Sequence, residues 1–275
     1  MSKFRSLVML RLAAFLITIL SCVSVYSIEN KDIQTVLEKE GYKAAFILLK
    51  QLAEQGDPKA QFELGAIYYF PLDESIKKDI NEAFKWYTKA ALQGQVEAQY
   101  NLGVMYDQGK GVPKNYSDAY KWYKLAAEQG FANAQYNLGV MYDQGKGVPK
   151  NYIDAYKWYK LAAEQGFANA QYNLGVMYDQ GYGIPKNYAQ AIKWYKLAAE
   201  QGFANAQYNL GVMYYRGEGI PKNYIDAYKW FNIVVSSEDK VSDAARALMN
   251  INEPRMTSEQ IATAQNLAKE WVENH

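Results

Sequence analysis

A segment of 36 residues recurs along most of this 275-residue chain with almost no change. Its central copy runs from Gly130 to Gln165 and differs from the next copy, 166–201, at only five of 36 positions. One glycine in a Leu-Gly-x-x-Tyr context marks the period. It stands at Gly65, Gly103, Gly139, Gly175 and Gly211, at separations of 38, 36, 36 and 36 residues. Such a period is typical of helical solenoids, whose units pack mainly on their neighbours, and it predicts an all-α fold.

Each repeat is predicted to hold two helices joined by a loop. Helix A of the central copy, 133–144, places Ala134, Leu138 and Tyr142 on one face, and Gly139 offers a small surface that a second helix can approach. The Gly-x-Gly-x-Pro loop at 145–150 ends helix A, because glycine allows positive φ and proline cannot continue a helix. Helix B then begins with a capping box and ends at glycine. The capping pair is Asn151 with Asp154, the expected buried residues of helix B are Ala155, Trp158, Tyr159 and Ala162, and the final glycine is Gly166.

The repeats divide the chain into consecutive segments. They are a leader at 1–27, N-terminal capping helices at 28–57, a degenerate first repeat at 58–93, repeats at 94–129, 130–165, 166–201 and 202–237, and a degenerate C-terminal capping repeat at 238–275. Gly41 is expected to split the N-terminal helices, and a Thr257-x-x-Gln260 capping box to open the last helix. Such terminal segments are where a solenoid needs polar-faced caps.

The leader has the pattern of a secretory signal. Lys3, Arg5 and Arg11 precede an apolar run at 12–20 that is short for a membrane span, and cleavage is expected after Ser27. Two alternatives stay open: an uncleaved membrane anchor, and a lipoprotein cleavage box in which Cys22 becomes lipidated. We therefore expect an exported protein, periplasmic or secreted, that meets a membrane only through the leader or a lipid on Cys22.

Charge and residue inventory argue against several functions. Lys and Arg number 30 against 29 Asp and Glu, which is not the strongly basic balance of a nucleic-acid binder. Cys22 and His275 are the only cysteine and histidine, so we expect no histidine-based triad, no metal cluster and no cofactor. Two serine-lysine pairs have the spacing of penicillin-recognising enzymes but lack the Ser-Asp-Asn and Lys-Thr-Gly partners. These pairs are Ser75 with Lys78 and Ser237 with Lys240.

The motifs resemble the Sel1-like repeat, a relative of the tetratricopeptide repeat. Over residues 58–237 the chain repeats Ala-x-x-x-Leu-Gly-x-x-Tyr, then Gly-x-Gly-x-Pro, then Ala-x-x-Trp-Tyr-x-x-Ala-Ala-x-x-Gly, with departures in the first and last copies. The resemblance implies a right-handed α/α superhelical solenoid that holds a protein or peptide partner and catalyses no reaction. Two alternatives remain. One is a β-lactam-binding or hydrolysing protein, as cysteine-rich relatives are described, although this chain lacks their cysteines. The other is a periplasmic assembly factor for an envelope or polysaccharide-export complex.

The same resemblance proposes a stripe of helix A residues for partner binding on the concave face. Its members are Glu97, Tyr100, Val104 and Asp107; Asn133, Tyr136, Val140 and Asp143; Asn169, Tyr172, Val176 and Asp179; and Asn205, Tyr208, Val212 and Tyr215, with Arg216 beside the last. Tyrosine presents apolar area at low entropy cost together with a polar tip, which suits recognition. The alternative is that these tyrosines pack between adjacent A helices as part of the core.

The fifth repeat differs from the others within this stripe. It carries Tyr215-Arg216 where the fourth carries Asp179-Gln180, whereas the third and fourth copies do not differ anywhere in helix A. Near-identity of two copies suggests recent duplication and says little about selection. The fifth copy is therefore where we expect specificity to change along the surface.

Overall fold

A computed structural model of the protein describes residues 33, 35–38, 41–71, 73–237 and 241–274. Within these residues every regular element is a helix, so the predicted all-α solenoid of helical repeats is confirmed. The chain forms two compact units, one ending at Gln93 and the other beginning at Gly94. The predicted leader with Cys22, and the terminal His275, lie outside the described residues.

The unit that ends at Gln93 contains three described helices: α3 (Tyr42–Glu54), α4 (Pro58–Tyr69) and α5 (Ile80–Leu92). Gly41 precedes α3 with a φ of 85°, which favours glycine, so the predicted break falls at this residue. Leu49 of α3, Leu64 of α4 and Trp86 of α5 share one buried cluster. The degenerate first repeat therefore packs its two helices on the N-terminal helix by the same apolar contact that joins the later repeats.

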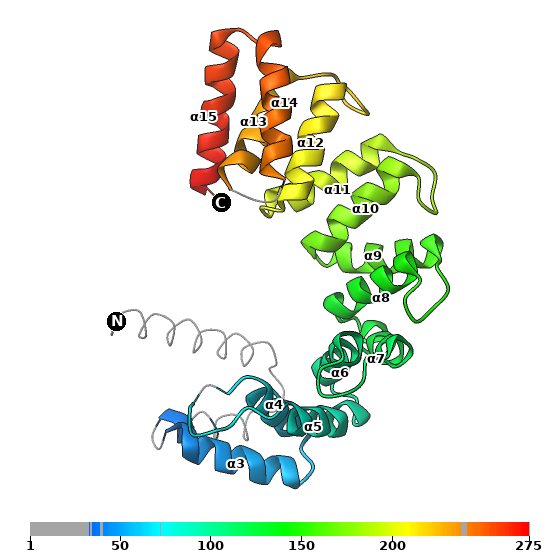
Figure 1. The fold of residues 1–275 in the computed structure, drawn as a ribbon, viewed down its shortest axis with the longest axis vertical. Coiled ribbons are helices and arrows are strands. Elements are labelled where there is room, and N and C mark those ends of the chain that lie inside the picture. The colour runs from blue at the N-terminus through cyan, green and yellow to red at the C-terminus, as the bar shows by residue number, and fades with distance from the viewer. Residues whose placement is uncertain (1–32, 34, 39–40, 72, 238–240, 275) are drawn as a thin grey trace. The chain divides into compact units, whose positions relative to one another are not determined.

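The unit that begins at Gly94 continues as a series of helix pairs, each pair beside the next (Figure 1). The A helices are α6 (Val96–Gln108), α8 (Ala132–Gln144), α10 (Ala168–Gln180) and α12 (Ala204–Arg216). The B helices are α7 (Tyr116–Glu128), α9 (Tyr152–Glu164), α11 (Tyr188–Glu200) and α13 (Tyr224–Ser236). The end is formed by α14 (Ser242–Asn252), a short 3₁₀ turn η1 (Glu253–Arg255) and α15 (Ser258–Asn274).

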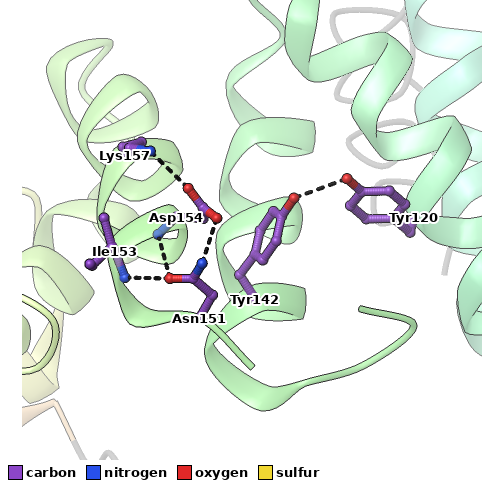
Figure 2. Close-up of polar contacts among 6 residues, drawn as sticks. All are labelled: Tyr120, Tyr142, Asn151, Ile153, Asp154 and Lys157. Atoms are coloured by element: carbon purple, nitrogen blue, oxygen red, sulfur yellow. Dashed lines mark hydrogen bonds and ion pairs between the residues drawn. The ribbon is translucent and has the colours of Figure 1, made fainter. Parts of the chain in front are cut away.

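Each B helix begins at the cap that the sequence predicts. In the central repeat, Asn151 Oδ1 accepts hydrogen bonds from the backbone N–H of Ile153 at 3.0 Å and of Asp154 at 3.2 Å. Its Nδ2 donates to Asp154 Oδ2 at 2.7 Å, and Lys157 Nζ contacts Asp154 Oδ1 at 2.9 Å (Figure 2). These contacts satisfy N–H groups that a helix start otherwise leaves without a partner.

Within a repeat, the two helices meet through a glycine and an aromatic ring. Ala155, Tyr159 and Ala162 of α9 are buried as predicted, whereas Trp158 stays half-buried. A Cβ atom on Gly139 would lie 2.6 Å from Cδ1 of the Tyr159 ring, closer than carbon atoms approach. Glycine at this place therefore lets α8 and α9 come together over the ring, which explains why the same residue marks the period of the sequence.

A glutamine clamp holds the first helix of a repeat to the end of the preceding repeat, and helical periodicity did not predict it. Buried Gln135 of α8 donates from Nε2 to the carbonyl oxygen of Ala127 at 3.2 Å, at the end of α7. Gln165, which follows α9, donates to Gln135 Oε1 at 2.7 Å and to the Gly130 carbonyl at 2.9 Å. The paired glutamines recur as Gln93 with Gln61, Gln129 with Gln99, and Gln201 with Gln171. The clamp satisfies carbonyl groups at helix ends that pack out of solvent.

Changing Gln135 to methionine is expected to lower the free energy of unfolding by about 1–3 kcal/mol, because the buried Ala127 carbonyl and the Gln165 amide lose their partner while the volume is nearly kept. Urea denaturation followed by circular dichroism measures the loss. The matched control is Gln144→Met at the exposed end of α8, which should change stability by less than about 0.5 kcal/mol. Equal effects of the two changes would contradict a role for the clamp.

Tyrosine pairs form a second link between repeats. The hydroxyl groups of Tyr120 on α7 and Tyr142 on α8 lie 2.9 Å apart (Figure 2), and Tyr156 and Tyr178 repeat this contact at 2.9 Å. Burial, and then the hydrogen bond with Tyr156, raise the pKa of Tyr178 to about 12, so its hydroxyl stays protonated at neutral pH. Tyr142 thus reaches the preceding repeat as well as its own helix pair.

The last three elements close the C-terminal unit. Trp271 of α15 packs on Trp230 of α13, with ring centroids 6.0 Å apart. The predicted capping box opens α15: the Thr257 N–H donates to Gln260 Oε1 at 2.9 Å, and the Gln260 N–H donates to Thr257 Oγ1 at 3.2 Å. None of the helices in the described ranges is both long and apolar enough to cross a membrane.

Candidate functional site: a hollow between α10 and α12

A hollow of about 460 Å³ lies between helices α10 and α12, with further walls from α11 and α14. We call it the α10–α12 hollow. Seven residues of the predicted stripe line it: Tyr172, Val176, Asp179, Tyr208, Val212, Tyr215 and Arg216. The structure thus brings together stripe residues of the fourth and fifth repeats around one hollow. They include Tyr215 and Arg216, the pair that distinguishes the fifth repeat.

The other predicted stripe residues lie outside the hollow. They are Glu97, Tyr100, Val104 and Asp107 on α6; Asn133, Tyr136, Val140 and Asp143 on α8; Asn169 at the start of α10; and Asn205 at the start of α12. All of these side chains are half-buried. Their role in binding a partner stays a prediction.

The stripe tyrosines Tyr136 and Tyr172 each pack against one ring of their own repeat and one ring of the next repeat. Tyr172 of α10 has its ring centroid 5.9 Å from that of Tyr195 on α11 and 5.1 Å from that of Phe203, which caps α12. Tyr136 makes the equivalent contacts with Tyr159 at 5.8 Å and Phe167 at 5.1 Å. These contacts agree with the alternative interpretation of the sequence, in which the tyrosines pack as part of the core between adjacent repeats. Only the remaining edge can meet a partner, and Tyr172 and Tyr208 present it to the hollow.

Three polar groups meet at one corner of the hollow. The Tyr195 hydroxyl is buried and makes no hydrogen bond of ordinary length, although the Asp179 carboxylate and the Asn209 side chain are its polar neighbours. Burial raises the pKa of Tyr195 far above its usual value, the negative charge of Asp179 raises it further, and the contact with Asn209 acts in the opposite direction. The hydroxyl consequently stays protonated beside the carboxylate.

The same three residue types meet in the two preceding repeats. We call the sets the Asp–Tyr–Asn triads, and they are Asp107, Tyr123 and Asn137; Asp143, Tyr159 and Asn173; and Asp179, Tyr195 and Asn209. In the second of these the Tyr159 hydroxyl donates to Asp143 Oδ2 at the long distance of 3.5 Å. At the next offset of 36 residues all three positions differ: Tyr215 and Phe231 stand in the fifth repeat, and Ala245 in the C-terminal capping repeat. Loss of the carboxylate thus coincides with loss of both of its polar neighbours.

The wall formed by the fifth repeat is held from the C-terminal cap. Arg255 donates from Nη1 to the Tyr215 hydroxyl, and its guanidinium lies 5.4 Å from the centre of that ring. Arg216 is paired with Glu218 at 3.8 Å. These contacts fix the aromatic wall and partly neutralise the one basic side chain that lines the hollow.

Sequence reasoning missed the inner wall of the hollow. Tyr195 was expected to serve only as a core residue of helix B, and Asn209 and Leu248 were not considered. A signal was present, because the counterparts of Asp179, Tyr195 and Asn209 at an offset of 36 residues all differ in type. Helical periodicity alone assigns a residue to a face, but it does not show which residue of the next repeat stands opposite.

The first serine-lysine pair, Ser75 with Lys78, does not form a helical Ser-x-x-Lys site. Ser75 lies in the loop between α4 and α5, where its N–H bonds to Asp73, and Lys78 lies over the rings of Tyr69 and Phe70. Ser237 ends α13 and donates from its hydroxyl to the Val234 carbonyl, whereas Lys240 lies outside the described residues. Among the residues with assigned positions, no group of three or more His, Cys, Asp or Glu side chains is arranged to hold a metal ion.

The fold and the hollow define a helical-repeat protein of the interaction-scaffold type. The family model described as Sel1 repeat matches residues 38–57, 58–95, 96–131, 132–167, 168–203 and 204–233. These segments make up well over half of the chain, so the protein belongs to the Sel1 repeat family.

Two solved structures resemble the chain closely. A protective antigen of uropathogenic Escherichia coli with the SLR fold, c5321, is 37% identical over 84% of this chain and 49% of its own, with a TM-score of 0.74. A Sel1 repeat protein from Oxalobacter formigenes is 35% identical over 77% of this chain and 86% of its own, with a TM-score of 0.71.

Two curated proteins share shorter stretches. The chitin synthase regulator SKT5 of Saccharomyces cerevisiae is 43% identical over 61 residues, and HRD3A of Arabidopsis thaliana, a component of an ERAD-associated E3 ubiquitin-protein ligase, is 34% identical over 76 residues. These stretches are 22% and 28% of this chain, but only 9% and 11% of the two relatives. The similarity concerns the repeats and not the whole of either protein.

Proposed function

We propose that this protein is an exported scaffold that binds a protein or peptide partner at the α10–α12 hollow and catalyses no reaction of its own. The observation that carries the proposal is the hollow itself, because it joins tyrosine edges, valines and a carboxylate at one place on a repeat fold. Concave sites with aromatic anchors and a few polar groups are the usual form of recognition sites.

The relatives support a scaffold rather than an enzyme. SKT5 is named as a regulator of another protein's activity, and HRD3A as a component of a ligase. A repeat fold supplies an extended surface without needing a reactive centre. Export is supported by the leader at 1–27, with its basic residues, apolar run and small residues before the expected cut.

Filling the hollow is expected to weaken partner binding about tenfold or more. Gln180 is exposed and lines the hollow, so Gln180→Trp places a large ring where the partner would lie. The mature protein is used as bait, the captured protein is identified by mass spectrometry, and its dissociation constant is then measured with purified components.

The matched control for this experiment is Gln265→Trp on α15, an exposed glutamine that lies outside the hollow. The control should bind the captured protein as the wild type does. If Gln180→Trp binds as tightly as the control, the hollow is not the recognition site. Mass spectrometry of the same preparation determines the N-terminus, and a chain beginning after Ser27 is expected for an exported, cleaved protein.

A further inference from the structure

The aspartates of the three Asp–Tyr–Asn triads form no salt bridge in the described part of the protein, although Lys114, Lys150 and Lys186 lie near enough to interact with their charges. Asp107, Asp143 and Asp179 are half-buried, and no lysine or arginine of the described residues comes within ion-pair distance of any of them. Asp179 Oδ2 accepts a hydrogen bond from Gln180 at 2.7 Å. A carboxylate that is partly removed from water gains much from a positive partner.

The buried tyrosine hydroxyl is the second observation that points to a ligand. Tyr195 is 1% exposed, yet its hydroxyl makes no hydrogen bond of ordinary length in a wall of the hollow. A buried hydroxyl without a good partner costs free energy, which a ligand that improves its hydrogen bonding returns. An N–H donor that reaches this corner would meet the Asp179 carboxylate, beside the Tyr195 phenol group and the Asn209 side chain.

The surroundings of the corner suit a long cationic side chain. Val176 and Val212 offer apolar surface to a methylene stem, and tyrosine rings attract a cation over their faces. Arg216 is the basic residue of the lining, and Glu218 pairs with it. Asp179 therefore supplies the net charge of the hollow.

Resting on the proposed scaffold function, we infer that the partner is an extended peptide segment rich in lysine or arginine, whose basic side chains enter the triads of successive repeats. The second, third and fourth repeats each provide one triad at the same offset of 36 residues. At the next offset Tyr215, Phe231 and Ala245 replace Asp, Tyr and Asn, so the series of triads ends there.

The experiment measures fluorescence anisotropy of a labelled fifteen-residue peptide of repeated Gly-Ser-Lys, with repeated Gly-Ser-Glu as the acidic comparison. At low ionic strength, where screening is weak, the mature protein should bind the lysine peptide and not the acidic one. The triple change Asp107→Asn, Asp143→Asn and Asp179→Asn should weaken binding about tenfold or more, since it removes three charges without changing shape.

A matched triple variant removes the same charge elsewhere. Glu128, Glu164 and Glu200 end helices α7, α9 and α11, repeat at the same 36-residue offset, and are about half exposed in surface pairs with lysine. Their change to glutamine should leave peptide binding within about twofold of the wild type. Equal weakening by the two triple variants would show general attraction to an acidic protein and overturn the triads as the site.

Tyr195→Phe separates recognition from folding. Phe231 shows that phenylalanine fits the equivalent place of the fifth repeat, so the variant should unfold at the wild-type temperature or above it while binding the lysine peptide several-fold more weakly. Unchanged binding would exclude the hydroxyl as a ligand group and overturn the triad. The two proposals can also fail separately. If the wild type does not bind the lysine peptide, but Gln180→Trp abolishes binding of the captured protein, then the inference of a basic partner is wrong and the scaffold function stands.

Discussion

Replacing Gly175 by valine is expected to lower the free energy of unfolding by about 3 kcal/mol, at the upper end of the cost of overpacking a core. A Cβ at this position would lie 2.5 Å from Cδ1 and 2.6 Å from Cε1 of the Tyr195 ring. The ring has no room to retreat, because Tyr195 is 1% exposed and packs on Tyr172 with centroids 5.9 Å apart. The gain in helix propensity over glycine is at most about 1 kcal/mol, so the clash decides the sign.

A double-mutant cycle with Tyr195→Ala tests the cause. If the clash is with the ring, Gly175→Val should cost much less when Tyr195 is already alanine, with a coupling of about 1–3 kcal/mol between the two sites. Urea unfolding of the four proteins measures it. Additive effects of the two changes would mean that valine acts through the helix backbone and not through the ring.

The contact between Gly175 and Tyr195 lies within one helix pair, and features within a helix pair were largely predictable from the sequence. The period, the loop and the caps are local properties, so Gly139, Asn151 and the Thr257–Gln260 box had predictable places. The small residue in helix A also predicted a close approach, and the structure identifies Tyr159 as the ring that approaches Gly139. These features depend on neighbours within one helix pair, where spacing along the chain determines spacing in space.

Contacts between repeats were harder to predict. Tyr136 was placed on the correct helix face, but Phe167 covers its ring from the start of the next helix A, and no periodicity within helix A contains that contact. The clamp residue Gln135 likewise bonds to the Ala127 carbonyl of the preceding repeat. A polar residue that recurs once per repeat in a buried position has a structural reason, and that reason becomes visible only when the neighbouring repeat is placed.

The same distinction applies to the candidate site: residues within one repeat were predicted, whereas contacts that span two repeats were not. Tyr215 and Arg216 drew attention because they break the repeat, and the structure places both on the wall of the hollow. Asp179 was included in the stripe, but its relation to Tyr195 and Asn209 spans two repeats. Comparing copies at a fixed offset, three positions at a time, would have exposed the triads, whereas a helical wheel of one copy cannot.

Changing Tyr159 to alanine is expected to lower the free energy of unfolding by about 3–5 kcal/mol, the cost of removing a large buried aromatic side chain. Tyr159 is 1% exposed, fills the space beside Gly139 and packs on Tyr136 with centroids 5.8 Å apart. Because a solenoid repeat is stabilised by its neighbours, a lesion in this central repeat should also separate the unfolding of the two flanks and broaden the urea transition.

Tyr159→Phe is the matched control, since it keeps the ring and removes only a hydroxyl whose hydrogen bond to Asp143 is 3.5 Å long. Its cost should be below about 1 kcal/mol, and phenylalanine at the equivalent Phe231 is fully buried in the fifth repeat. Circular dichroism and tryptophan fluorescence during urea unfolding follow both variants. If phenylalanine costs as much as alanine, the polar contact with Asp143 holds the repeat together, and the Asp–Tyr–Asn triads are structural devices rather than sites for a basic partner.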